Sequence, residues 1–403
     1  MANTWATGYL PNIISDSRQF LRKQCAFLAM TNKDFSQASG IKGSTVNIPI
    51  PATLSAASIT PANYSPDGTA QSLSTATLTL DNFQGSTPFA VTNQHLQNYQ
   101  LEGPGSILQQ MINSAIAAVV DAVATDLQSK YYQIPTFVGV GGSAFFYNGG
   151  AYNITGLTNA RKELFAQKVP ADRPLYGVFS YLDVAHLRNV TTVQQAYSIG
   201  TPTVIQDGAF PSIMGFGIKE DYFVTSHTVG TLKASNITKA ATAQAVGTTS
   251  LVCTTPATTS ACALKKGDII TYAGANYSVQ ANVTQATAST DYTITLDRGI
   301  ETAAAGSEAV TLATNFGSGR TNIAGDLMGA SLVTRLPSNP AELSDLPAKL
   351  MGEHIPVVDP VSGMAILLSF YGQFHQRMMQ ASLIWGSAMT DPRRLVRCLS
   401  ATA

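Results

Sequence analysis

Apolar residues between positions 99 and 135 recur at intervals of three and four, the spacing of one face of a helix. Polar residues fall between them, and Pro104 suits a first helical turn. The pattern predicts one amphipathic helix of roughly 25 residues, about 37 Å long. The repeat comprises Leu108, Met111, Ile112, Ala115, Ile116, Val119, Val120, Val123 and Leu127.

Residues 1–40 show weaker helical periodicity and have no complementary segment nearby in the sequence. We expect an N-terminal arm that buries its apolar residues against another surface. Several Lys and Arg residues lie near the start of the chain, and Asp16 and Asp34 among them reduce the local positive charge. We therefore expect them to form a solvated or interfacial face. They are Arg18, Arg22, Lys23, Lys33 and Lys42.

Residues 41–98 change to strand character. Alternation at 45–50 predicts a half-buried strand, and segments 76–80 and 89–91 predict the returning strand. The connection contains Pro61 and the turn signal of Pro66, Asp67 and Gly68. A two-stranded excursion is only marginally stable alone, so we expect it to lie on a neighbouring chain.

The rest of the chain alternates between mixed and all-β character. Residues 136–231 predict helices at 157–167 and 181–189, the latter capped by Ser180, with a strand at 175–179 between them. Residues 232–312 are rich in Thr, Ala, Ser, Val and Gly, and their short strand-like runs predict a small inserted β domain. Residues 313–403 return to mixed character and complete an α+β fold. Apolar strands are expected there at Phe370, Phe374, Leu383, Ile384 and Trp385.

Composition favours a protein that associates. Hydrophobic residues make up 45% of the 403 residues, whereas charged residues reach only 12% and cancel to a net charge of zero. The usual charged fraction is about 25%, and a near-zero net charge promotes association. The balance also argues against a dedicated nucleic-acid reader, which carries a basic patch.

The cysteines and the N-terminus indicate an intracellular site of synthesis. Cys25, Cys253, Cys262 and Cys398 form no CxxC pair and no zinc-ligand spacing with the histidines. A Cys253–Cys262 disulfide is possible if the two lie on neighbouring strands, but reduced, buried thiols are the better expectation. The first residues lack the basic and apolar regions of a signal peptide.

The sequence offers no positive case for catalysis. It has no phosphate loop, no HExxH and no GxSxG. The glycines at 139–142 resemble a dinucleotide fingerprint, but an aromatic, turn-rich segment follows instead of a helix. The five histidines, 95, 186, 227, 354 and 375, are scattered without helical pairs, so we expect structural roles, no cofactor, no metal and no enzyme activity.

The order of these segments resembles an HK97-type phage capsid protein, and within it the gene-product-5-type coat family of short-tailed phages. Three short motifs carry the resemblance: Gly208-x-Phe210-Pro211-x-Ile213-x-Gly215-Phe216-x-Ile218, Lys266-Gly267-Asp268-Ile269 with Tyr272-Ala273-Gly274, and Asp391-Pro392-Arg393-Arg394. Each motif is short, and their order and position make the case.

The resemblance implies an α+β HK97-like fold. Its parts would be an N-arm at 1–40, an E-loop at 41–98, a spine helix at 99–135, a body of peripheral (P) and axial (A) subdomains at 136–231 and 313–403, and the β insert at 232–312. Copies would form hexamers and pentamers of an icosahedral virion shell assembled in the bacterial cytoplasm. Expected partners are a scaffolding protein, a portal protein, a decoration protein and weakly bound double-stranded DNA, with no membrane.

We expect the assembly contacts to include seven residues of the E-loop tip and the N-arm. They are Pro61, Pro66, Asp67, Gly68, Arg18, Arg22 and Lys23. Two alternative functions stay open at this point. One is an encapsulin-like shell around a cargo enzyme, and the other is a secreted adhesin or surface-layer protein, suggested by the abundant Thr, Ser, Ala and Gly.

Overall fold

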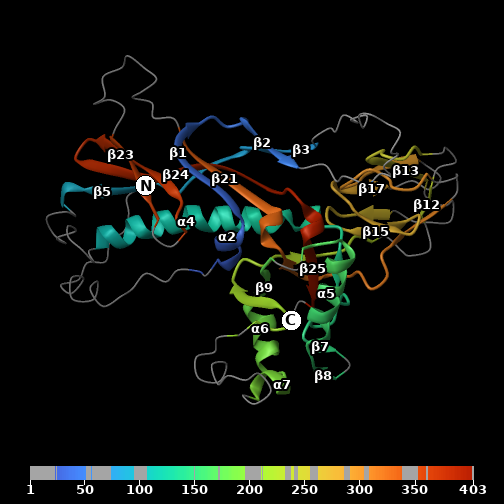
Figure 1. Ribbon diagram of the computed structural model, residues 1–403. Helices are drawn as coiled ribbons and strands as arrows, with labels where there is room; N and C mark the ends of the chain where they lie inside the picture. The colour runs from blue at the N-terminus through green and yellow to red at the C-terminus, as the bar shows by residue number, and fades with distance from the viewer. Residues whose placement is uncertain are drawn as a thin grey trace, which may run out of the picture.

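The structure is a computed structural model (Figure 1). It describes residues 23, 25–50, 56, 74–94, 107–148, 150–170, 173–195, 210, 212–231, 237–239, 244–254, 262–285, 291–303, 308–337, 353–359 and 362–401.

The first part of the body joins the long helix α4, Ile107–Ser129, to a seven-stranded sheet. The helix lies along one face of this sheet in Figure 1 and is continued by the 3-10 turn η1, Lys130–Gln133. The strand order is β1-β21-β24-β23-β22, with β4 and β5 pairing along β24. These strands are β1 Asn32–Gly40, β4 Asn82–Gly85, β5 Phe89–Thr92, β21 Ala330–Pro337, β22 Glu353–Val358, β23 Ala365–Gln373 and β24 Gln376–Met389.

The apolar face of α4 forms the core of this part, as its periodicity predicts. Val119, Val123 and Leu127 are at most 2% exposed and pack with Trp385 of β24. Burying each such aliphatic side chain stabilises the fold by about 1.5–3 kcal/mol. Gln128 departs from the pattern, because this polar side chain is also buried, at 1% exposure.

The second part of the body is built on a six-stranded mixed sheet of order β10-β9-β20-β25-β6, with β11 on β20. Every residue of the central strands β20 and β25 is buried. Helices α5, Thr155–Ala166, α6, Tyr181–Arg188, and α7, Thr191–Gln194, belong to this part. Its strands are β6 Phe137–Val138, β9 Leu175–Ser180, β10 Phe216–Asp221, β11 Ser226–His227, β20 Gly319–Gly325 and β25 Leu395–Ser400.

The expected all-β insert is present, with a core of its own, and leaves and rejoins the second sheet at the paired strands β11 and β20. Its main sheet has the order β16-β15-β19-β12-β13-β18, and β14 pairs with β17. Its strands are β12 Ile237–Lys239, β13 Ser250–Thr254, β14 Cys262–Leu264, β15 Ile269–Tyr272, β16 Ala275–Ser278, β17 Val283–Gln285, β18 Asp291–Thr295 and β19 Ala309–Leu312.

The remaining elements are short. The hairpin strands β2, Thr45–Ile50, and β3, Ser74–Thr79, lie at the top of Figure 1 and, among the described residues, pair only with each other. The others are α2 Ala26–Met30, β7 Tyr147–Asn148, β8 Ala151–Tyr152, η2 Leu327–Gly329 and η3 Pro392–Arg394.

The α+β class and the order of parts along the chain, with a hairpin, a long helix, a two-part body and a β insert, are confirmed. The exact domain boundaries stay predictions. Within the segment expected as an arm, Phe27 is buried in the core of this chain and β1 pairs in parallel with β21. Chain-distant pairing of this kind leaves no local signal.

Three local expectations also need correction. Segment 89–91 is not part of the hairpin, since β5 pairs with β24. Ser180 occupies the N-cap position of α6 but makes no side-chain capping bond, and its backbone N–H instead donates to Asn322 Oδ1 at 2.8 Å. Phe374 is not in a strand but in the tight turn between β23 and β24.

Candidate assembly interface

The β2–β3 hairpin is an open two-stranded ribbon. Its six paired positions run from Thr45–Thr79 to Ile50–Ser74, and within the described residues neither strand pairs with a third. Only its base is anchored, where Leu78 and Leu80 pack with Val333 and Ile384. The strands therefore offer unpaired backbone donors and acceptors on both edges, which are templates for another chain.

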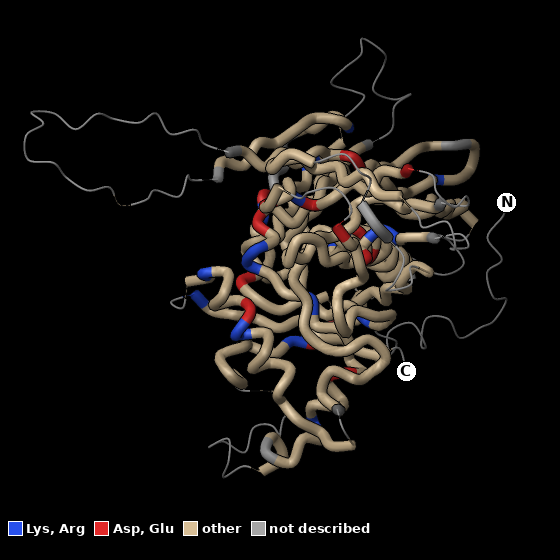
Figure 2. The backbone as a smooth tube through the Cα atoms, turned by 90° about the vertical axis from the view of Figure 1, so that its right-hand side faces the viewer, with Lys and Arg blue, Asp and Glu red and all other residues tan. Residues whose placement is uncertain are grey.

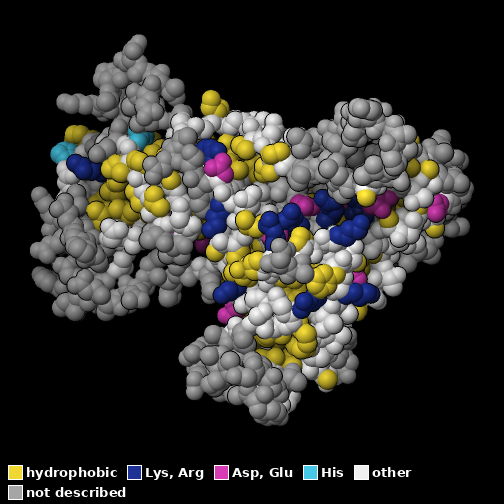
Figure 3. Space-filling view, in the orientation of Figure 1, with side chains coloured by type: hydrophobic (Ala, Val, Ile, Leu, Met, Phe, Trp, Pro, Cys, Tyr) yellow, Lys and Arg dark blue, Asp and Glu magenta, His cyan; other side chains and the backbone are white. Residues whose placement is uncertain are grey.

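A second exposed surface lies at the far edge of the seven-stranded sheet. Phe374 is 89% exposed at the tip of the β23–β24 hairpin, and its neighbour His375 has a φ of 51°, a strained value for a residue with a side chain. Ile355 and Val358 are exposed on the edge strand β22. Figure 3 shows hydrophobic side chains gathered on this lobe. Exposed apolar side chains on one lobe make it a candidate for contact with another chain.

Lys23 is the one predicted assembly residue that lies among those described. Its ammonium is 3.6 Å from Asp121 Oδ2 on α4, and it lies 5.1 Å from the ring centre of Tyr222. The predicted residues Pro61, Pro66, Asp67, Gly68, Arg18 and Arg22 lie outside the described residues. The structure therefore brings Lys23 to the junction of α4 and the second sheet and does not place the other six.

The segment that follows Lys23 is held by a buried carboxylate. Asp221, at the end of β10, accepts the backbone N–H groups of Phe27 at 2.9 Å and Phe223 at 2.7 Å. Burial raises the pKa of Asp221, and the same burial raises the pKa of the adjacent Cys25 thiol to about 12. These contacts fix the start of α2 against the end of β10.

The insert is mounted on the body by a buried arginine that sequence reasoning missed. Arg397 on β25 is fully buried and donates to the carbonyl oxygens of Ile134, Tyr132 and Gly267 and to Ser278 Oγ. Burial lowers its pKa to about 10. The guanidinium thus joins the end of the spine helix to the turn between β14 and β15 and to strand β16 of the insert.

A buried histidine reinforces the same junction. His227 Nε2 lies 2.8 Å from Asp268 Oδ1, and Tyr131 Oη lies 3.0 Å from His227 Nδ1. Because a carboxylate only accepts, Nε2 donates to Asp268, and in the neutral ring Nδ1 is then the acceptor for the tyrosine hydroxyl. Asp268 also accepts the backbone N–H of Lys265 at 2.8 Å and that of Gly230 at 3.1 Å. The arrangement looks like a catalytic relay, but all of its polar atoms are used in joining elements.

A second buried network was also missed. Asp183 of α6 accepts from Arg320 Nη2 at 2.9 Å and from Asn322 Nδ2 at 2.8 Å, both on β20, and from Ser400 Oγ on β25. Buried charges need such pairing to be tolerated. No local pattern could have shown these pairs, because the partners lie 137 or more positions apart.

The recognised motifs take part in turns and junctions. Ala273 and Gly274 have φ values of 48° and 78° and form the two-residue turn between β15 and β16. Asp391 accepts from Arg393 Nε at 3.1 Å and from Arg394 Nε at 3.0 Å around η3. These two motifs therefore form a turn and a local group of ion pairs in the fold.

The glycine-rich segment 139–142 passes close to the backbone of residues 315–317. A Cβ on Gly141 would lie 2.2 Å from the Cα of Gly317, and the Gly141 N–H donates to the carbonyl of Asn315 at 2.9 Å. The expectation of a loop is confirmed. The backbone approach alone explains the glycine at position 141.

Three further features were searched for among the described residues: metal-ligand groups, a Cys253–Cys262 pair and membrane-spanning helices. No group of three or more His, Cys, Asp or Glu side chains that could hold a metal occurs among the described residues. Cys253 and Cys262 lie on β13 and β14, which belong to different sheets. In the same described part of the chain, no helix is long and apolar enough to span a bilayer.

Comparisons with known proteins give matches in structure but not in sequence. No protein-family model matches the chain, and no curated protein matches it. A chain of Mycobacterium phage Che8 is similar with a TM-score of 0.49 and 12% identity, covering 99% of this chain and 96% of that one.

Two further matches are to phage capsids. The capsid structure of the cyanophage P-SCSP1u has a TM-score of 0.48 and 11% identity over 96% of this chain and 91% of that one. The capsid of Ralstonia phage GP4 has a TM-score of 0.44 and 8% identity over 100% and 95%.

Proposed function

We propose that this chain is a major capsid protein, whose copies assemble into the icosahedral shell of a tailed double-stranded DNA phage. The observation that carries the proposal is the β2–β3 hairpin, a ribbon with two open edges and a single anchored base. An isolated two-stranded ribbon is marginally stable in water. We therefore expect the hairpin to pack against a neighbouring copy of the chain.

Surface composition supports the same reading. Charged residues are sparse along the chain and of both signs in Figure 2, in keeping with the 12% charged fraction. Large apolar side chains such as Phe374 stay exposed in the monomer. A protein that assembles with copies of itself can have such an apolar surface, because the neighbouring copies cover most of that surface.

The finer parts of the proposal concern arrangement and partners. Copies form hexamers and pentamers in the host cytoplasm, with a scaffolding protein guiding assembly, a portal protein at one vertex and a decoration protein as a further partner. The packaged DNA contacts the shell weakly and without sequence preference. The role is structural and not enzymatic, since the buried His227–Asp268 and Asp183–Arg320 networks join elements of the fold.

Negative-stain electron microscopy of the purified chain, with sedimentation velocity alongside, tests the proposal. We expect closed shells of uniform diameter, or ring-shaped hexamers and pentamers. A monomer that stays soluble across protein concentration, salt and added scaffold would contradict it. Shells that enclose an enzyme and no nuclease-protected DNA would instead favour the encapsulin-like alternative.

A further inference from the structure

Three chain segments that carry arginines meet at one edge of the six-stranded sheet. Gly325, the last residue of β20, pairs with Tyr176 of β9 and with the first residue of β25. The turns η2 and η3 lie side by side at this edge, because the Asp326 N–H donates to the carbonyl oxygen of Arg394 at 3.0 Å. Arg173, two residues before β9, is the third contributor.

The arginine edge consists of Arg173, Arg393 and Arg394, which share two carboxylates. Arg394 Nη1 donates to Asp326 Oδ2 at 2.9 Å, and its Nε donates to Asp391 Oδ2 at 3.0 Å. Arg393 Nε donates to Asp391 Oδ1 at 3.1 Å. Arg173 Nη1 lies 3.8 Å from Asp326 Oδ2, too far for a hydrogen bond. In this network three guanidinium groups face two carboxylates, which leaves one positive charge in excess.

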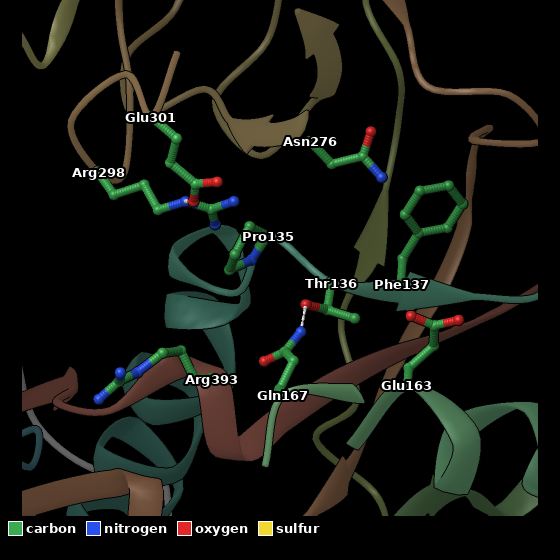
Figure 4. Close-up of a pocket in the computed structure, with 9 residues that line it drawn as sticks. All are labelled: Pro135, Thr136, Phe137, Glu163, Gln167, Asn276, Arg298, Glu301 and Arg393. Atoms are coloured by element: carbon green, nitrogen blue, oxygen red, sulfur yellow. Dashed lines mark hydrogen bonds and ion pairs between the residues drawn. The ribbon is translucent and has the colours of Figure 1, made fainter. Parts of the chain in front are cut away.

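The carboxylates of this network lie inside and the guanidinium groups lie outside. Asp326 is buried and Asp391 is half-buried. The side chains of Arg173 and Arg393, by contrast, are 48% and 65% exposed. Within the described part of the chain, the two terminal nitrogens of Arg393 make no hydrogen bond. Figure 4 shows this side chain directed away from Gln167, across a neighbouring cavity of about 470 Å³.

The surface around this edge is richer in cations than the neutral composition suggests. Figure 3 shows Lys and Arg side chains gathered across the middle of one face, over the region where Figure 1 places β9, β25 and α5. Smaller groups of acidic side chains lie among them. The 24 cations and 24 anions of the chain therefore do not give an evenly neutral surface.

We propose that the arginine edge contacts the phosphate groups of double-stranded DNA. The inference rests on the proposed function, because it names the surface through which a shell subunit meets the packaged duplex. A guanidinium with free terminal nitrogens can donate two parallel hydrogen bonds to a phosphate. The phosphates of a duplex are closely spaced, so neighbouring arginines can act together. Such contacts read no bases, and the binding is therefore weak and independent of sequence.

Fluorescence anisotropy of the full chain with a labelled duplex of about 20 base pairs, at salt from about 50 to about 200 mM, tests the surface. Arg173→Gln and Arg393→Gln should each reduce the slope of log affinity against log salt by about 0.9 and weaken binding by up to about tenfold, because one phosphate contact is lost.

Arg188→Gln is the matched control. Its side chain is 43% exposed and pairs with Glu220 at 2.6 Å. It lies at the end of α6, which begins where β9 ends, so it belongs to the opposite edge of the same sheet. This variant should change neither the slope nor the affinity. Because Arg173 and Arg393 are exposed, their variants should fold normally, and a thermal melt checks this.

Three results would overturn the proposal. Equal losses for all three variants would show that the DNA contact is spread over the whole surface. Duplex binding that Arg173→Gln and Arg393→Gln leave unchanged would exclude this edge. Binding of poly-glutamate that depends on these two arginines, without binding of the duplex, would assign the edge to an acidic polypeptide instead. Each of these results leaves the proposed function standing, because electron microscopy of the wild-type chain tests shell formation separately.

Discussion

At the scale of single residues, Arg397 shows how a buried charge fixes the position of the insert. The guanidinium is fully buried and makes hydrogen bonds to four acceptors contributed by η1, by Ile134 directly after it and by the insert. Its pKa is lowered to about 10 by burial, so the group stays charged at neutral pH. The charge is satisfied by backbone carbonyl groups and one hydroxyl.

Replacing this side chain should be strongly destabilising. Arg397→Met removes the donor and leaves the carbonyl groups of Ile134 and Gly267 without it, so we expect the free energy of unfolding to fall by about 3 kcal/mol or more. Urea denaturation followed by circular dichroism measures the change. Arg393→Met, at an exposed arginine four positions earlier, should change it by less than about 1 kcal/mol. Equal effects for the two variants would refute this role.

At the scale of elements, one carboxylate docks the spine helix on its sheet. Asp126 of α4 accepts from Trp385 Nε1 at 3.2 Å and Ser387 Oγ at 2.6 Å on β24, and from Asn82 Nδ2 at 3.1 Å on β4. The helix face, the central strand and the strand after the hairpin are thereby joined at one point. The apolar periodicity of α4 sets which face is buried, and Asp126 adds a directional contact.

We expect Asp126→Ala to lower the free energy of unfolding by about 2–4 kcal/mol, because the buried Trp385 on β24 and two half-buried donors, Ser387 and Asn82, lose their acceptor. Asp121→Ala is the matched control on the same helix, where the carboxylate forms a 3.6 Å ion pair with the half-exposed Lys23. That control should cost at most about 1 kcal/mol. Thermal and urea unfolding of both variants provide the comparison, and a neutral Asp126→Ala would rule out the docking role.

The hairpin itself gives a prediction about assembly. Deleting residues 55–70 removes the Pro-rich tip between β2 and β3 and leaves the anchored base at Leu78 and Leu80 intact. We expect a folded subunit with an unchanged circular dichroism spectrum that assembles poorly, because contacts to the neighbouring copy are lost. Electron microscopy and sedimentation velocity measure assembly. Normal shells from the deleted chain would disprove action on a neighbour.

At the scale of the whole molecule, charge balance sets how the protein meets DNA. Lys+Arg and Asp+Glu number 24 each, so the chain as a whole supplies no net attraction to phosphate. We expect the isolated subunit to bind duplexes of different sequence with equal, weak affinity that falls further with salt. Fluorescence anisotropy with two unrelated duplexes at about 150 mM salt tests this. A preference above about a hundredfold would contradict it.

Much of the fold was readable in local patterns, because periodicity reports which face of an element is buried. The three-and-four repeat located α4, alternation located β2, and the change in composition located the insert. Turn chemistry was equally local, as at Ala273 and Gly274. Low charge and an unpartnered ribbon also indicated a protein that assembles.

The tertiary structure alone decided which distant segments meet. The pairing of β1 with β21, the burial of Arg397 and the Asp183–Arg320 contact join residues far apart in the chain. A lone charged residue has the same local appearance whether it ends on the surface or at the centre of a junction. A cavity lined by Thr136, Glu163 and Arg298, among others, was likewise unpredictable from the sequence, because separate segments of the chain form it. Sequence patterns report local geometry, and the packing of whole elements sets the surroundings of each side chain.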